Sequence, residues 1–286
     1  MRIAGAPISW GVCEVPGWGY QMSPERVLTE MAEVGLAATE FGPDGFLSGD
    51  PVKRADTLAA HGLSAVGGFV PVVLHDEGHD PVADVDAVLP AFTASGADTL
   101  VLAAATGTDG YDTRPELSAA QWHTLLANLD RLAERAAAAG IAATLHPHVG
   151  TLVETRSDVY RVLDGSTIPL CLDTGHLLIG GTDPVALARE AAARVAHVHL
   201  KDVDAGWAAR VQAGEIAYSA AVREGIYRPL GDGDIDIAAI VAALSTVDYS
   251  GWYVLEQDTV LTAEPPAVGG PVEDVRRSLA HLLEVA

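Results

Sequence analysis

Apolar runs of four to eight residues alternate along this chain with longer segments of helical periodicity. Each run is nearly continuous in apolar character, as expected for a strand that is buried on both faces of a parallel sheet. Eight βα units in 286 residues leave about 36 residues for each unit, close to the roughly 250-residue (β/α)8 barrel. We therefore predict an α/β fold, a TIM barrel in which residues 1–286 form a single domain. The eight predicted strands are Ile3–Trp10, Ala38–Gly42, Leu63–Val72, Thr99–Ala105, Ile141–His146, Leu170–Asp173, Ala196–Leu200 and Trp252–Glu256.

The segments between the runs carry signals for helix starts and stops. Ser23 and Asp183 each precede a proline, which places a capping side chain before a proline at the first helical position. The longest helix is predicted from about Ser118 to Ala139, because its apolar residues form one stripe that can pack on a sheet. Helices are expected to stop at Gly35, Gly62 and Gly140.

One connection departs from this regular alternation. The polar, glycine-containing stretch at about 202–236 separates the seventh strand from the next regular helix. We predict an irregular, elongated βα loop there. Long connections of this kind are where a barrel builds a lid over its active site.

Composition and charge narrow the class of protein. With 49% apolar and 20% charged residues, the chain is typical of a compact soluble protein. A net charge of −22 opposes binding to nucleic acid and to anionic membrane surfaces. Cys13 and Cys171 lie far apart, so neither a disulfide framework nor a thiolate zinc site is expected. Because we find no secretory leader and no apolar run long enough to span a membrane, we expect a cytoplasmic protein.

Polar side chains end four successive predicted strands, at the edge where a barrel carries its functional groups. A buried histidine is more often a core residue, Asp173 could cap the following turn, and Glu256 could lie on the rim. Together, however, two buried carboxylates without a nearby Lys or Arg are costly, and a divalent cation removes that cost. A set of imidazoles and carboxylates suits Mn²⁺, Co²⁺, Fe²⁺, Ni²⁺ or Zn²⁺, with Mg²⁺ as a further candidate. The predicted metal ligands are His146, Asp173, His199 and Glu256.

Two further residues are candidate catalytic groups. His148 lies two residues after His146 and could handle a proton or bind substrate, although Pro147 between them could turn the chain. Lys201 stands two residues after His199 and therefore on the same strand face. Near a cation and partly desolvated, its pKa is expected to fall, which suits a general acid or base. The alternative is a rim lysine paired with Asp202.

Candidate substrate contacts are less specific. Glu154 lies in the loop after the fifth strand, and Arg228 lies in the long segment before the GDGD sequence. Either could bind hydroxyls or a carbonyl, and either could be solvated surface. Trp10 and Trp18 could form apolar walls for a ring, with plain packing as the alternative for Trp10.

Four motifs, LHPHVGTLVET, LDTGH, HVHLKD and VLEQD, together resemble those of the xylose isomerase-like superfamily of sugar isomerases, epimerases and dehydratases. The opening GAPISWGVCEVPGWG resembles the inosose (2-keto-myo-inositol) dehydratase branch. The resemblance implies a TIM barrel with a divalent metal, often Mn²⁺ or Co²⁺, bound at Asp173, His199 and Glu256. The fifth-strand position departs from the pattern, because His146 stands where many members have a glutamate. The resemblance also implies catalytic roles for His148 and Lys201 and substrate contact by His176.

The activity implied is the dehydration of an inosose in inositol catabolism, through an enolate intermediate. The alternative with the same enolate chemistry is a sugar isomerase or a ketose 3-epimerase. A third interpretation is a barrel that binds a polyol, or serves as a partner subunit, without catalysis. A DNA-repair endonuclease of the same superfamily is disfavoured, because it needs further histidine ligands where the fourth strand ends in Ala103-Ala104-Ala105. The expected partner is a small polyol or sugar; the sequence leaves open whether the chain forms a homo-oligomer.

Overall fold

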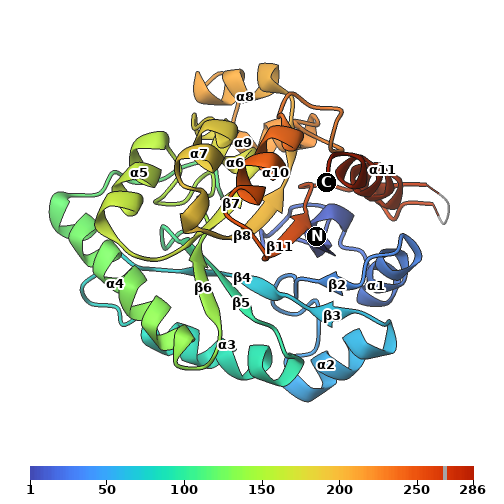
Figure 1. Ribbon diagram of the computed structural model, residues 1–286, viewed down its shortest axis with the longest axis horizontal. Coiled ribbons are helices and arrows are strands. Elements are labelled where there is room, and N and C mark those ends of the chain that lie inside the picture. Colours follow the sequence, from blue (N-terminus) through green and yellow to red (C-terminus); the bar gives the residue numbers. More distant parts are fainter. Residues whose placement is uncertain (267–268) are drawn as a thin grey trace.

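In the computed structural model, which describes residues 1–266 and 269–286, parallel strands form a central barrel with helices around it (Figure 1). The strands run in the spatial order β3-β2-β1-β11-β8-β7-β6-β5-β4. Their bounds are β1 (Arg2–Gly5), β2 (Ala38–Thr39), β3 (Ser64–Ala65), β4 (Gly67–Val72), β5 (Thr99–Ala104), β6 (Ala142–Leu145), β7 (Leu170–Asp173), β8 (Val195–Leu200) and β11 (Trp252–Leu255).

The barrel closes at β3 and β4, which are two parts of the single predicted strand Leu63–Val72. β3 pairs with β2, and β4 pairs with β5. At the break, the Val66 N–H donates to the Thr39 carbonyl, whereas the Val66 carbonyl accepts from the Thr99 N–H on the other side. The nine strands of the sheet are therefore eight barrel strands, the third of which is counted as both β3 and β4, and the predicted number of βα units is confirmed.

The first two strands are shorter than predicted. β1 ends at Gly5, and the rest of the predicted strand forms the short 3₁₀ helix η1 (Pro7–Trp10). Pro7 has no N–H to donate to a neighbouring strand and suits the start of a helix. β2 keeps only Ala38–Thr39 of the predicted Ala38–Gly42. The other strands agree with the prediction to within one or two residues at each end.

The helices for which the sequence predicts a start or a stop begin and end within about two residues of it. The Ser23 hydroxyl accepts from the Arg26 N–H, and the Asp183 carboxylate accepts from the first N–H groups of its helix. Ser118 and Gln121 form a reciprocal capping box at the longest helix. The bounds are α1 (Pro24–Glu33), α2 (Pro51–Ala60), α3 (Val82–Ser95), α4 (Ala119–Ala137), α5 (Arg156–Gly165), α6 (Thr174–Ile179), α7 (Pro184–Glu190), η2 (Ala192–Arg194), α10 (Ile237–Ser245) and α11 (Pro271–Val285).

The connection at 202–236 is not irregular, contrary to the prediction. Asp202, at the start of the connection, accepts from the N–H groups of Gly231, Gly233 and Ile235 near the end of the connection. This buried carboxylate therefore holds the GDGD sequence against β8. The connection contains β9 (Asp202–Val203), α8 (Ala205–Gln212), α9 (Tyr218–Arg223) and β10 (Tyr227–Arg228), with β9 and β10 paired antiparallel.

Among the described residues, no helix is both long and apolar enough to cross a membrane. Most of the core is one large cluster of buried side chains from the sheet and the inner faces of the helices, and a small second cluster is formed by Ala4, Ala6, Ala38, Val66 and Val254. Helix α8 of the 202–236 connection packs against α6, which directly follows the carboxyl end of β7, and α9 lies near them in Figure 1. This is the end of the barrel at which the polar strand ends gather.

Candidate active site

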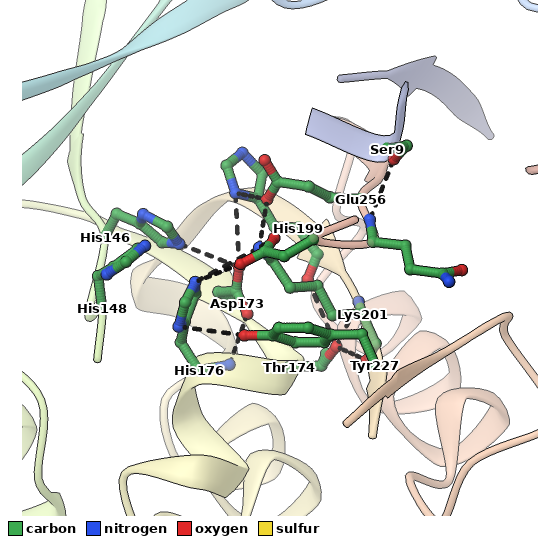
Figure 2. A network of polar contacts seen from close by, with 12 residues as sticks. Ser9, His146, His148, Asp173, Thr174, His176, His199, Lys201, Tyr227 and Glu256 are labelled. Carbon is green, nitrogen blue, oxygen red and sulfur yellow. Dashed lines mark hydrogen bonds and ion pairs between the residues drawn. The ribbon is translucent and has the colours of Figure 1, made fainter. Parts of the chain in front are cut away.

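The four predicted metal ligands come from four strands that are neighbours in the sheet. His146 directly follows β6, Asp173 ends β7, His199 lies in β8 and Glu256 directly follows β11. Asp173 and His199 are partners in the β7–β8 register. The first three side chains are almost completely buried, and the Glu256 side chain is 11% exposed. The fold therefore brings all four together, as Figure 2 shows.

The atoms of this group lie within a few ångströms of one another. His146 Nε2 is 3.0 Å from Asp173 Oδ2. His199 Nδ1 is 2.8 Å from Glu256 Oε2 and 3.6 Å from Asp173 Oδ2. Asp173 Oδ2 is thus the central atom of the cluster.

Asp173 uses its two oxygens for different tasks. Oδ1 accepts from the His176 N–H at 2.8 Å and caps helix α6. Oδ2 faces His146 and His199. Capping and metal binding were alternatives at the level of sequence, and the geometry is compatible with both at once.

The donor set fits a divalent cation. One ligand atom each from Asp173, His199 and Glu256 falls within 4.8 Å of the others. The buried atoms His199 Nδ1 and Glu256 Oε2 lie 2.8 Å apart but do not meet hydrogen-bond geometry with each other. Burial would raise the pKa of Glu256, but His199 and Lys201 outweigh burial and lower it to about 2, so the carboxylate is ionised. Buried imidazole nitrogens and carboxylate oxygens that converge in this way are ligands that a divalent metal ion prefers.

A thiol lies next to this cluster without joining it. Cys171 in β7 falls within ligand distance of His146 and His199. Burial raises the pKa of the Cys171 thiol to about 11, so the thiol keeps its proton at neutral pH. The predicted ligand set of nitrogen and oxygen donors leaves this thiol out.

Lys201 is buried among carboxylates and is not a rim residue. Its Nζ contacts Asp258 and lies 3.2 Å from Glu256 Oε2 and 3.7 Å from Asp173 Oδ2. Burial would lower the pKa of Lys201, but these three carboxylates outweigh burial and raise it well above the ordinary value. Without a metal ion the direction is thus opposite to the one expected for Lys201 beside a cation, and the alternative pairing with Asp202 is not seen.

His148 lies on the cavity wall with a defined orientation. Its Nδ1 lies 2.7 Å from the Val149 carbonyl, which can only accept, so Nδ1 carries the hydrogen. Nε2 is left with a free lone pair. The ring stacks near Tyr111 and His176, with centroid distances of 4.3 and 3.7 Å. Burial, together with the nearby His146 and Lys201, lowers the pKa of His148 well below its ordinary value.

His176 lies behind the cluster and does not line the cavity. Its Nε2 is 3.3 Å from Lys201 Nζ, and its Nδ1 is 3.5 Å from the Tyr227 hydroxyl. Figure 2 shows this ring between His148 and Tyr227. The direct substrate contact that the resemblance implies for His176 stays a prediction, and in this structure the ring contacts Lys201 and Tyr227.

Three other candidate substrate contacts also lie outside the cavity. Glu154 forms an ion pair with Arg114 and accepts from the Gly150 N–H. Arg228 lies 3.3 Å from Asp204 and is 40% exposed. Trp10 is completely buried, and its indole N–H donates to Glu30, so packing is its observed role. Each side chain is already occupied by a partner away from the cavity.

The cavity beside the cluster has a volume of about 480 Å³. Trp18, one of the predicted walls, lines it together with Phe69 and Tyr111. Of the described charged side chains that line it, six are carboxylates and one is a cation. The ionisable lining residues are Glu14, Glu40, Asp44, Asp84, Glu256, Asp258, His146, His148 and Lys201.

Three residues of the site were missed by sequence reasoning. Glu40 follows β2 and accepts from His199. The predicted ligands all came from the fifth to eighth strands. Asp258 ends the sequence VLEQD but was given no role. Tyr218 comes from α9 and donates to Asp258 at 2.8 Å. The polar end of the second strand was a usable signal for Glu40, whereas nothing in the sequence marks Tyr218.

A protein-family model described as "Xylose isomerase-like TIM barrel" matches residues 29–285. The chain belongs to this family. An inosose dehydratase from Geobacillus kaustophilus is 32% identical over 99% of this chain and 96% of that protein. The rhizopine catabolism protein MocC of Rhizobium meliloti is 34% identical over 90% of this chain and 82% of that protein.

Solved structures share the architecture of this chain. The D-allulose 3-epimerase from Methylomonas sp., solved in complex with D-allulose, superposes on this chain with a TM-score of 0.71 and 18% identity. The superposition covers 100% of this chain and 97% of the epimerase. The predicted xylose isomerase-like (β/α)8 barrel is thereby confirmed.

Proposed function

We propose that this protein is a metal-dependent dehydratase of inosose, acting in cytoplasmic inositol catabolism. The observation that carries the proposal is the joint position of His148 and Lys201 on the wall of one cavity, beside the His146, Asp173, His199 and Glu256 cluster. The near full-length similarity to an inosose dehydratase supports the same substrate class. Dehydration of a ring ketone needs two proton transfers, and the cavity offers one group for each.

The cluster would hold a divalent cation, for which we propose Mn²⁺ or Co²⁺. Asp173, His199 and Glu256 would be its ligands, with His146 at the fourth position. When bound, such a cation supplies positive charge that stabilises the oxyanion of an enolate, an effect of several kcal/mol.

The proton tasks follow from the hydrogen bonds of the two catalytic candidates. His148 has its hydrogen on Nδ1, so Nε2 is the atom that can accept the α-proton of the ketone. Lys201 is surrounded by three carboxylates, which favour the ammonium form. Lys201 would give a proton to the departing β-hydroxyl, which leaves as water while the carbon–carbon double bond forms. Asp258 holds the ammonium in place, and the Tyr218 hydroxyl holds Asp258 by donating to it.

The charge of the cavity excludes one class of substrate. Six carboxylates and a single ammonium line it among the described residues, and no arginine does. A phosphorylated sugar would need cationic partners for its phosphate, and the carboxylates would repel it. We therefore propose an uncharged cyclic polyhydroxy ketone as the substrate.

Turnover and metal removal together test this function. We expect the Mn²⁺-loaded or Co²⁺-loaded protein to convert scyllo-inosose to the enolic dione, followed by its ultraviolet absorbance. Dialysis against a chelator should abolish turnover, and added Mn²⁺ or Co²⁺ should restore it, because the divalent cation would supply the charge that stabilises the enolate oxyanion. Full activity after complete metal removal, verified by elemental analysis, would refute metal dependence.

The same preparation separates the dehydratase from its alternative. Ketoses are incubated in parallel, and epimers are followed by chromatography. Epimer formation without any dione from inosose would replace the dehydratase by a ketose 3-epimerase, a possibility raised by the epimerase fold neighbour.

A further inference from the structure

A carboxylate from the opposite side of the barrel binds both histidines of the HVH sequence. Glu40 Oε1 lies 2.8 Å from His197 Nε2 and 2.9 Å from His199 Nε2. Glu40 is 3% exposed, and the two imidazoles are 0% and 1% exposed. In the sheet, β1 and β11 separate β2 from β8, so the Glu40 side chain reaches its partners across the barrel interior.

These contacts fix which nitrogen of each ring carries a hydrogen. An ionised carboxylate can only accept, so each Nε2 must donate. The other nitrogen of His199, Nδ1, then faces Glu256 and Asp173 at 2.8 and 3.6 Å. A histidine binds a metal ion through a nitrogen without hydrogen, and its second nitrogen commonly donates to a carboxylate that holds the ring in place.

We propose that Glu40 is a positioning residue for the metal site, acting through His199. By accepting the Nε2 hydrogen, Glu40 holds the His199 ring with Nδ1 beside Glu256 and Asp173, where Nδ1 would lose its hydrogen and bind a cation that these carboxylates share. The proposal rests on the proposed function, because it assumes that this cluster binds a divalent cation.

His197 has a supporting part in the same arrangement. His197 and His199 alternate along β8, so both rings point into the barrel. Among the described residues, these two imidazoles are the groups within ion-pair distance of Glu40. The second hydrogen bond, from His197, keeps Glu40 Oε1 in reach of His199 without a Lys or Arg partner.

The test is the affinity for Zn²⁺ alone, measured in competition with a chromogenic chelator. We expect Glu40→Gln, whose amide oxygen can still accept, to weaken binding by about tenfold, and Glu40→Ala by about 100-fold. Glu30→Gln is the matched control, because Glu30 is also a buried, hydrogen-bonded glutamate but lies against Trp10 and Arg26. Equal Zn²⁺ affinity in wild type and both Glu40 variants would overturn the proposal.

A second measurement separates positioning from direct ligation. In Co²⁺-loaded Glu40→Gln, the visible absorption bands should keep the wild-type shape, because the ligand set is intact. A changed band pattern would show that Glu40 is itself a ligand and would overturn the proposal.

If the variants do not fold, the wild-type protein alone can test the proposal. With ¹⁵N-labelled histidine and Zn²⁺, nitrogen–proton correlation spectra should show His199 with its hydrogen on Nε2 and the metal on Nδ1. The opposite assignment would overturn the proposal. A wild-type protein that binds no Zn²⁺ at all would overturn both this inference and the metal part of the proposed function, whereas unchanged affinity in the variants overturns this inference alone.

Discussion

Replacing Lys201 by alanine should lower kcat for inosose dehydration by about 10²–10⁴-fold, with the bound metal retained. The β-hydroxyl is a poor leaving group, and Lys201 Nζ is the ammonium on the cavity wall that can protonate it. The change is measured as steady-state dione formation, with metal content checked by elemental analysis.

The chain contains two lysines, which gives this experiment a matched control. Lys53 lies exposed on α2, so Lys53→Ala should leave kcat unchanged. Because Lys201→Ala leaves three carboxylates without their shared cation, Lys201→Met, which keeps most of the side-chain volume, is tested beside it. A folded, metal-loaded Lys201→Met protein with wild-type kcat would show that Lys201 is not the proton donor.

Replacing Trp10 by alanine should lower the free energy of unfolding by about 3–5 kcal/mol. Trp10 is completely buried, and its indole N–H donates to Glu30 Oε2 at 2.8 Å. The substitution removes a large apolar surface, leaves a cavity, and takes a partner from a buried carboxylate. Urea unfolding followed by circular dichroism measures the change.

The conservative variant tests whether Trp10 also contacts substrate. Trp10→Phe keeps most of the packing but loses the hydrogen bond, and we expect a loss of about 1–3 kcal/mol with an unchanged KM for inosose. An increase in KM at unchanged stability would restore Trp10 as a wall of the substrate site. Trp18→Phe serves as the comparison, because Trp18 lines the cavity.

Local signals were sufficient for most of the fold. The caps at Ser23, Ser118 and Asp183 act through groups within three residues in sequence, so the helix starts could be predicted. The strand ends were less predictable where an apolar run continues past the paired residues. Ile8 and Trp10 are apolar enough for a strand, but Pro7 turns this stretch into a 3₁₀ helix.

The candidate site was predictable to the extent that it lies at strand ends. His146, Asp173, His199 and Glu256 lie at or beside the ends of adjacent strands, and the barrel topology alone brings them together. Glu40 reaches His199 across the barrel, and Tyr218 comes from a helix in the 202–236 connection, so neither contact follows from strand order.

The charge environment of individual side chains was the property that the sequence predicted least well. The direction of the pKa shift of Lys201 depends on how many carboxylates surround it. Among these carboxylates, Asp258 raises the pKa most. Glu154 and Arg228 were plausible substrate contacts by type and position, yet Arg114 and Asp204 already bind them. Such pairings are set by side-chain packing and leave no pattern in the sequence.

Anomalous diffraction from crystals grown with excess Mn²⁺ tests most directly whether one ion binds where the four strands meet. We expect a single strong peak bounded by Asp173, His199 and Glu256, with His146 as the fourth neighbour. An empty cluster at saturating Mn²⁺, or a peak at another place in the barrel, would contradict a metal-dependent dehydratase built on these residues.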